Sequence, residues 1–140
     1  MKVTDAIRAD HRTLEPWLEC LFREAARDKA PQPGWVKGVA QVLRPVVLRH
    51  AEMETRLLFR LLPQDERWVI HVTNEHREIE RLLDAAADGS RSCLRHVANL
   101  LLGHFDEEEK FVLPLAERTL PAAALEALGR TWAQEAARGR

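Results

Sequence analysis

The chain carries one pattern of histidines and acidic residues twice, and this repeat limits its fold more than any other feature. Asp10-His11 recurs as Glu75-His76, and the segment from His50 to Glu54 recurs from His104 to Glu108. The order is therefore a lone histidine, an H-x-x-x-E motif, a second lone histidine and a second H-x-x-x-E motif. Side chains four residues apart project from the same face of a helix, so each motif places an imidazole beside a carboxylate.

Clusters of proline, glycine and capping residues divide the chain into helices. No stretch alternates as a strand does, so the sequence predicts an all-α fold. The expected helices cover residues 4–28, 35–62, 65–88, 90–118 and 121–137, with a linker over residues 29–34. Short connections favour an up-down-up-down four-helix bundle over residues 4–118, with a short C-terminal fifth helix over residues 121–137. The length suits a single domain spanning residues 1–140.

The expected helix ends rest on individual residues. Thr4 is the expected N-cap of the first helix, and Ser90 or Ser92 that of the fourth. Gly89 suits a left-handed C-terminal cap on the third helix. Pro45 should kink the second helix shortly before His50.

Helical periodicity places every motif histidine on an apolar stripe, and in a bundle four such stripes meet at the centre. The stripes are Ile7, His11, Leu14 and Leu18; Leu43, Val46, His50, Glu54, Leu57 and Leu61; Val69, Val72, His76, Ile79 and Leu83; and Val97, Leu101, His104, Glu108, Phe111 and Leu115. We therefore expect six candidate metal ligands to converge: His11, His50, Glu54, His76, His104 and Glu108.

Two buried carboxylates separate this pattern from an ordinary set of core histidines. Burying Glu54 and Glu108 without a partner would cost several kcal/mol each. The four stripes contain no Arg or Lys, so metal ions are the simplest compensation. Imidazole with bridging carboxylate suits iron or manganese better than zinc, which in structural sites prefers four closed nitrogen or sulfur ligands. The sequence thus predicts a centre with two metal ions.

Other polar residues near the motifs are expected to stay outside this centre. His71 lies about 140° and His96 about 80° around the helix from the nearest motif histidine. The residues set aside in this way are His71, His96, Glu107 and Glu109. Glu15 and Glu80, each four residues after a lone histidine, leave two alternatives open: the edge of an amphipathic helix, or an additional carboxylate close to the metals.

The four histidines and two glutamates, in this order and spacing, resemble the hemerythrin-like (HHE cation-binding) family over about residues 4–118. The resemblance implies a four-helix bundle with an oxo- or hydroxo-bridged di-iron centre, for which manganese or zinc can substitute. It implies that one iron is bound by His11 and His50, the other by His76 and His104, and that the bridges are Glu54 and Glu108.

Two departures from the oxygen-carrying members bear on function. Those proteins have a second histidine one turn after the third-helix histidine, where this chain has Glu80. Their bridging Asp lies five residues after the fourth-helix histidine, where this chain has Glu109. The chain is closer to the subgroup with the H, HxxxE, H, HxxxE set, found in iron-centre repair proteins and in bacterial proteins that respond to oxygen or nitric oxide. This likeness favours reaction with a ligand over reversible oxygen carriage.

The leading hypothesis is a non-haem di-iron protein that binds or reacts with O2, NO or peroxide in a stress response or in sensing. Catalytic turnover would need an external reductase, because the chain has no flavin, dinucleotide or cysteine-rich motif. One alternative is a module that stores, senses or donates iron without turnover. Another is a regulatory or structural bundle. A homodimer through the C-terminal helix would use the apolar edge formed by Leu125, Leu128 and Trp132.

Charge and hydropathy narrow the partners and the compartment. The formal net charge of −1 argues against a nucleic acid or an acidic membrane surface as partner. No apolar run approaches the roughly 20 residues of a membrane span, and the N-terminus lacks the pattern of a signal peptide. Cys20 and Cys93 lack the C-x-x-C spacing of a redox or zinc motif. We therefore expect a cytoplasmic protein.

Overall fold

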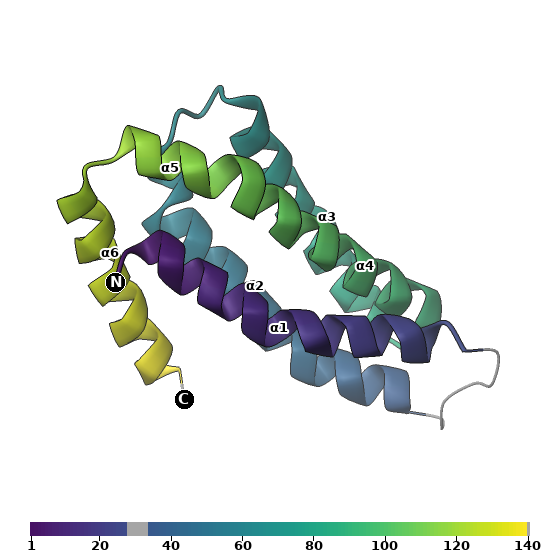
Figure 1. Cartoon of the computed structure of the whole chain (residues 1–140). Helices are drawn as coiled ribbons and strands as arrows, with labels where there is room; N and C mark the ends of the chain where they lie inside the picture. The colour runs from purple at the N-terminus through teal and green to yellow at the C-terminus, as the bar shows by residue number, and fades with distance from the viewer. Residues whose placement is uncertain (28–33, 140) are drawn as a thin grey trace.

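The computed structural model describes residues 1–27 and 34–139, and no strand occurs among them. Figure 1 shows long helices lying side by side and a further helix across one end. The helices are α1 (Val3–Ala25), α2 (Trp35–Leu57), α3 (Arg67–Ala87), α4 (Arg91–Glu107), α5 (Leu113–Thr119) and α6 (Ala122–Arg138). A 3₁₀ turn (Phe59–Leu61) follows α2, and a π-helical segment (Glu108–Val112) joins α4 to α5. The predicted all-α fold is confirmed.

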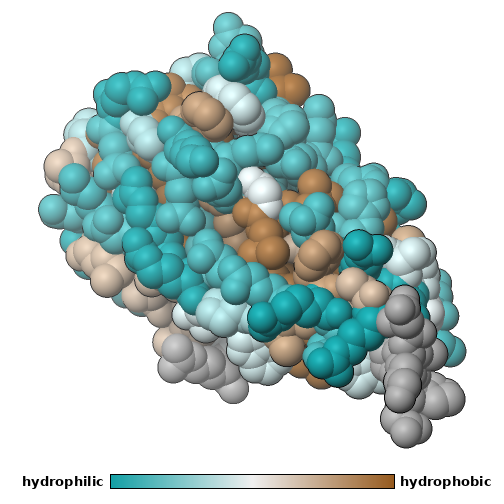
Figure 2. Space-filling view, turned by 45° about the vertical axis from the view of Figure 1, so that its right-hand side comes forward, coloured by the Kyte–Doolittle hydropathy of each residue, from teal (hydrophilic) through white to brown (hydrophobic). Residues whose placement is uncertain are grey.

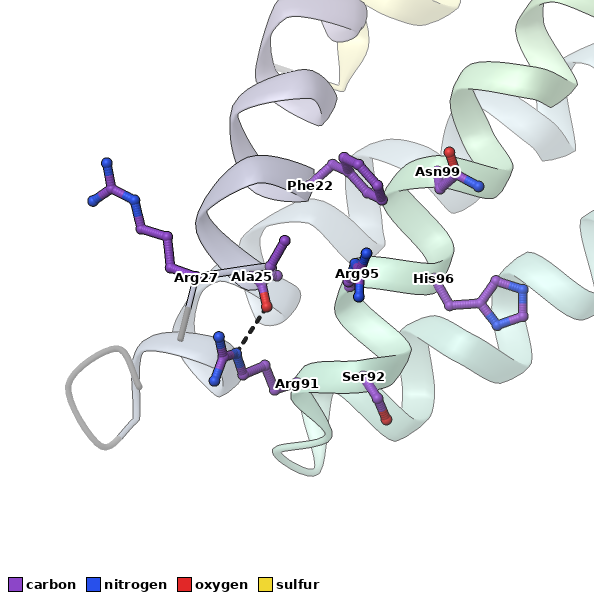
Figure 3. A pocket seen from close by; sticks show the side chains of 9 residues that line it. Phe22, Ala25, Arg27, Arg91, Ser92, Arg95, His96 and Asn99 are labelled. Carbon is purple, nitrogen blue, oxygen red and sulfur yellow. Dashed lines mark hydrogen bonds between the residues drawn. The ribbon is translucent and has the colours of Figure 1, made fainter. Parts of the chain in front are cut away.

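The bundle is built from α1, α2, α3 and the long helical segment that α4 begins. α4 packs against both α1 and α3, and α3 packs against α2. α4, the π-helical segment and α5 follow one another directly. They form one continuous helical segment from residue 91 to residue 119, with a π-helical stretch within it. At the end of the bundle where α1 ends and α4 begins, the Arg91 side chain donates a hydrogen bond of 2.8 Å to the carbonyl oxygen of Ala25 (Figure 3). This bond ties the end of α1 to the start of α4.

The C-terminal helix α6 lies beside the N-terminal end of α1 (Figure 1). Leu125 and Trp132 are buried in this contact. Gly129 permits the close approach, because a Cβ there would collide with the carbonyl oxygen of Met1. The chain therefore buries two of the three residues that the sequence offered for a homodimer contact, and the oligomeric state itself stays a prediction.

The apolar core has two parts, one on each side of the motif residues. Buried residues before and after each motif belong to different clusters: Ile7, Leu57, Val72 and Val112 to one, and Leu18, Val47, Ile79 and Leu101 to the other. The motif residues therefore lie between two layers of packed hydrocarbon, which fix the four helices around them.

Some helix ends agree with the sequence, and others do not. Ser90 caps α4 by accepting a hydrogen bond from the Cys93 amide, and Gly89 has the expected left-handed backbone with φ at 111°. The predicted N-cap Thr4 is wrong: Lys2 precedes the helix and Thr4 is buried within its first turn. α1 ends at Ala25, before the expected end at residue 28. Residue 28 itself and residues 29–33 of the expected linker over residues 29–34 lie outside the described residues.

The predicted core stripe of the second helix is wrong at two residues. Val46 is 49% exposed and Leu61 is 41% exposed. At Val46 the buried place is taken by Val47, and Val46 instead lines a cavity of about 690 Å³ between α1 and α2. At Leu61 the α-helix has already ended, at Leu57 instead of the predicted residue 62, and the 3₁₀ turn changes the helical phase.

The stripe of the fourth helix fails after Glu108. Phe111, predicted to face the core, is 40% exposed, and Val112 is buried instead. The π-helical segment explains the shift, because each of its turns holds more residues than an α-turn and rotates the later side chains relative to the expected stripe. Figure 2 shows a mostly hydrophilic face with hydrophobic residues gathered near its centre and smaller groups of them towards its edges. No helix in the described part of the chain has the length and apolar character needed to cross a membrane.

Candidate metal centre

The structure brings together all six residues that the sequence singled out. Each long helical segment contributes to the cluster: α1 provides His11, α2 provides His50 and Glu54, α3 provides His76, and the segment begun by α4 provides His104 and Glu108. Both carboxylates are 0% exposed, and three of the four histidines are buried, with His76 at the edge of the buried region.

Each carboxylate presents one oxygen to each pair of histidines. On one side, Glu54 Oε2 lies 3.3 Å from His50 Nε2, and Glu108 Oε2 lies 3.3 Å from His11 Nε2. On the other side, Glu54 Oε1 lies 3.5 Å from His76 Nε2, and Glu108 Oε1 contacts His104 Nε2. Two groups of four ligand atoms result, and they share both glutamates.

Most of these converging atoms lack a hydrogen-bond partner within the described part of the chain. Both oxygens of Glu54 and Glu108 are in this state, as is Nε2 of His11 and of His50. The Nε2 atoms of His76 and His104 face each other at 3.1 Å. Leaving so many buried polar atoms unpaired is costly, whereas a cation within each group would satisfy them together. The residues present therefore fit two metal ions, one in each group of four.

Mutual attraction within the cluster shifts its pKa values. Burial would lower the pKa of the imidazoles, but the facing carboxylates more than offset it and raise the pKa to about 9 at His11 and to about 10 at His50 and His104. Burial would raise the pKa of Glu54, yet the attraction of His50 more than offsets it and holds this pKa well below its usual value. Without metal, the cluster is thus stabilised by imidazolium–carboxylate pairs, and a metal ion must displace these protons.

The residue before each lone histidine forms a hydrogen bond with the histidine of an H-x-x-x-E motif. Asp10 Oδ2 lies 3.3 Å from His50 Nδ1, and Glu75 Oε1 lies 3.0 Å from His104 Nδ1. A carboxylate accepts hydrogen bonds, so Nδ1 keeps its proton, and the proton that a metal displaces is the one on Nε2.

The residue after each of the two motif glutamates makes the reciprocal contact. Glu109 Oε2 lies 3.1 Å from His11 Nδ1, and Thr55 Oγ1 lies 3.4 Å from His76 Nδ1. The sequence interpretation set Glu109 aside and did not consider Thr55. The repeat itself places these two residues at equivalent positions, because Thr55 follows Glu54 in one half and Glu109 follows Glu108 in the other.

Aromatic side chains fix the imidazole rings from the apolar side. Phe105 stacks on His11 with ring centroids 4.0 Å apart, and Trp132 of α6 meets His50 edge-on at 5.5 Å. Phe59, in the 3₁₀ turn, stacks on His76 at 5.8 Å. The rings are therefore held by packing as well as by hydrogen bonds.

The remaining polar candidates lie apart from these two groups. Glu80 is exposed and lies 4.0 Å from Arg44, as expected for the edge of an amphipathic helix. Glu15 is partly buried, and burial raises its pKa, with no place in either group of four. His96 lines a cavity of about 750 Å³ at the far end of the bundle, beside Arg95 (Figure 3). None of the six motif residues lines that cavity.

One comparison with known proteins places this arrangement in a family. A family model described as the hemerythrin HHE cation binding domain matches residues 2–116. No curated protein and no solved structure matches the chain.

Proposed function

We propose that this chain, which belongs to the hemerythrin family of HHE cation-binding domains, is a non-haem di-iron protein. It would bind or react with O2, NO or peroxide. His11 and His50 would hold one iron, His76 and His104 the other, and both glutamates would bridge. Manganese or zinc would occupy the same ligands as substitutes.

The shared carboxylates carry this proposal. Glu54 and Glu108 each direct one oxygen to the His11 and His50 side and the other to the His76 and His104 side. A buried carboxylate that serves a single ion needs only one oxygen for it, whereas here all four oxygens converge without hydrogen-bond partners in the described structure. Two ions held side by side explain why both oxygens of each residue are used.

Reactivity follows from the number of protein ligands. Each group of four provides two imidazole nitrogens and two carboxylate oxygens. Non-haem iron commonly has more than four ligands, so positions remain for an exogenous ligand. Glu80 adds no further ligand, because its side chain lies on the outer face near Arg44. The chain thus favours reaction over the reversible carriage that a more saturated iron supports.

A small ligand would approach on the side of His50. A cavity of about 230 Å³ reaches this residue. Both apolar and charged side chains line it, and the apolar ones include Leu14, Val46, Met53 and Trp132. Of the six motif residues, His50 alone lines it. Diatomic molecules and peroxide are small enough for such a space, whereas larger organic substrates would need the helices to move apart.

A pair of ferrous ions supplies two electrons, which is the number consumed in reducing one peroxide to water or two NO molecules to nitrous oxide. Repeated turnover therefore requires an external reductase. In this chain the carboxylates of Asp10, Glu75 and Glu109 keep the imidazole Nδ1 protons in place, so that Nε2 stays available.

An anaerobic titration of metal-free protein with Fe²⁺ tests the proposal. We expect two irons per chain, NO uptake by both, and oxidation by O2 or peroxide that is followed in the visible spectrum. Oxygen uptake that reverses fully under vacuum would contradict the proposed reactivity. Iron that leaves readily to a weak chelator and does not react with NO or peroxide would instead favour storage or donation.

A further inference from the structure

A second cluster of metal-ligand side chains lies outside the candidate centre. His71 and Glu75 are one turn apart on α3 in a third H-x-x-x-E motif, and Glu107 is the last residue of α4. One ligand atom from each lies within 4.8 Å of the others. The sequence interpretation excluded His71 from the central site, and the structure brings it into this separate group.

One distance within this cluster matches that between ligands of one ion. Two ligands at about 2.1 Å from a metal in a tetrahedral site are about 3.4 Å apart. His71 Nε2 lies 3.4 Å from Glu75 Oε1. It lies 2.6 Å from Glu107 Oε2, so these two side chains must move slightly apart to hold an ion.

One potential ligand atom of this cluster, an oxygen of Glu107, lacks a hydrogen-bond partner in the described part of the chain. Glu107 Oε2 is shielded from solvent and makes no hydrogen bond within the described part of the chain, although His71 Nε2 is close to it. The close approach therefore lacks the alignment of a hydrogen bond. Two carboxylates and one imidazole converging in this way form a donor set suited to a divalent first-row metal ion.

The cluster is open to solvent on one side and joined to the central site on the other. His71 is 45% exposed, so water could complete the coordination of an ion there. Glu75 Oε1, which faces His71, also lies 3.0 Å from His104 Nδ1. The same carboxylate thus faces both the outer cluster and an imidazole of the central site.

We propose that His71, Glu75 and Glu107 form a third, mononuclear site for a divalent metal ion, separate from the two central ions. This site does not depend on which metals the central residues hold. Its affinity is lower than theirs, because it has three protein ligands and is partly exposed, whereas each central group has four ligands and is buried apart from the edge of His76.

Calorimetric titration with Zn²⁺ tests the outer site in protein whose central site is already loaded with iron. We expect one further equivalent of Zn²⁺ per chain. His71→Ala should lose this equivalent while keeping the iron, and Glu107→Gln should do the same. His96→Ala is the matched control, since it removes an exposed histidine on α4 that belongs to neither cluster.

A neighbouring tryptophan gives a second readout. The ring of Trp68 meets His71 edge-on with centroids 5.5 Å apart. Co²⁺ bound at the outer site should therefore quench Trp68 fluorescence, and the quenching should be absent in His71→Ala and Trp68→Phe.

Equal Zn²⁺ binding by wild type and His71→Ala, or none in either, would overturn the proposal of an outer site. Failure of the central di-iron proposal would look different: the isolated protein would not hold two irons, yet His71→Ala would still remove one equivalent of Zn²⁺.

Discussion

Replacing Glu54 with Ala should weaken both central metal ions, because this residue directs one oxygen to each histidine pair. The variant would leave each ion with three of its four protein ligands. A structural four-ligand zinc site in a small domain binds with about 10–16 kcal/mol, or roughly 3 kcal/mol per ligand. Each ion should therefore bind about 10²-fold more weakly, since about 1.4 kcal/mol corresponds to a factor of ten.

Two other variants make this expectation specific. His11→Ala removes a ligand from only one group, so one ion should be weakened and the other retained. Glu52→Ala is a matched control on the same helix, where the side chain is exposed and pairs with Arg56. It should bind both ions as the wild type does.

Chelator competition followed by iron analysis separates these outcomes. The reasoning would fail if Glu54→Ala retained both ions with affinities within a few-fold of the wild type, or if it weakened only one of them. The strongest test is the double variant Glu54→Ala, Glu108→Ala, in which full occupancy by two ions would refute the ligand assignment.

Three further outcomes follow from the same geometry. Chelation of the metals should lower the melting temperature by roughly 10 °C or more, since metal binding to the native ligands adds several kcal/mol to the stability of the fold, at about 3 °C per kcal/mol for this size. An unchanged melting temperature after verified removal would contradict this. In metal-free protein the pKa of His50 is raised to about 10, so its contribution to stability is present below the unfolded value of about 6.5 and is lost as pH rises to 10. Calorimetry at pH 7 and pH 10 should therefore show a lower melting temperature at pH 10. Glu109→Ala should weaken the ion at His11 by about 10- to 100-fold, and Thr55→Ala should have a smaller effect at His76, as measured by chelator competition.

The main features of the fold and the six clustered residues could be predicted because they depend on regular helices. A period of 3.6 residues brings His50 and Glu54 onto one face wherever the helix stays regular. Apart from Val46, which lies within the regular part of α2, the predicted core stripes failed where the backbone leaves that period. Phe111 follows a π-helical segment, and Leu61 follows the end of α2, so neither keeps the expected phase.

The hydrogen-bond partners of the histidines were harder to predict, because each contact joins different helices. Glu109 of the π-helical segment contacts His11 of α1, and Asp10 of α1 contacts His50 of α2. Periodicity describes one helix at a time and contains no information on the rotation of its neighbours. His71 is a similar case, since its partner Glu107 comes from α4.

The repeat in the sequence corresponds to a near two-fold arrangement of contacts, and one position breaks it. The residue before each lone histidine is acidic in both halves, but the residue after each motif glutamate is Glu109 in one half and Thr55 in the other. A carboxylate that accepts the Nδ1 proton makes an imidazole a stronger metal ligand than a hydroxyl does. In the proposed di-iron centre His76 would therefore donate less charge than His11, and the two ions would differ electronically although their direct ligands are of the same kind. An exogenous ligand would then distinguish the two ions, and the difference would arise from a residue that contacts neither.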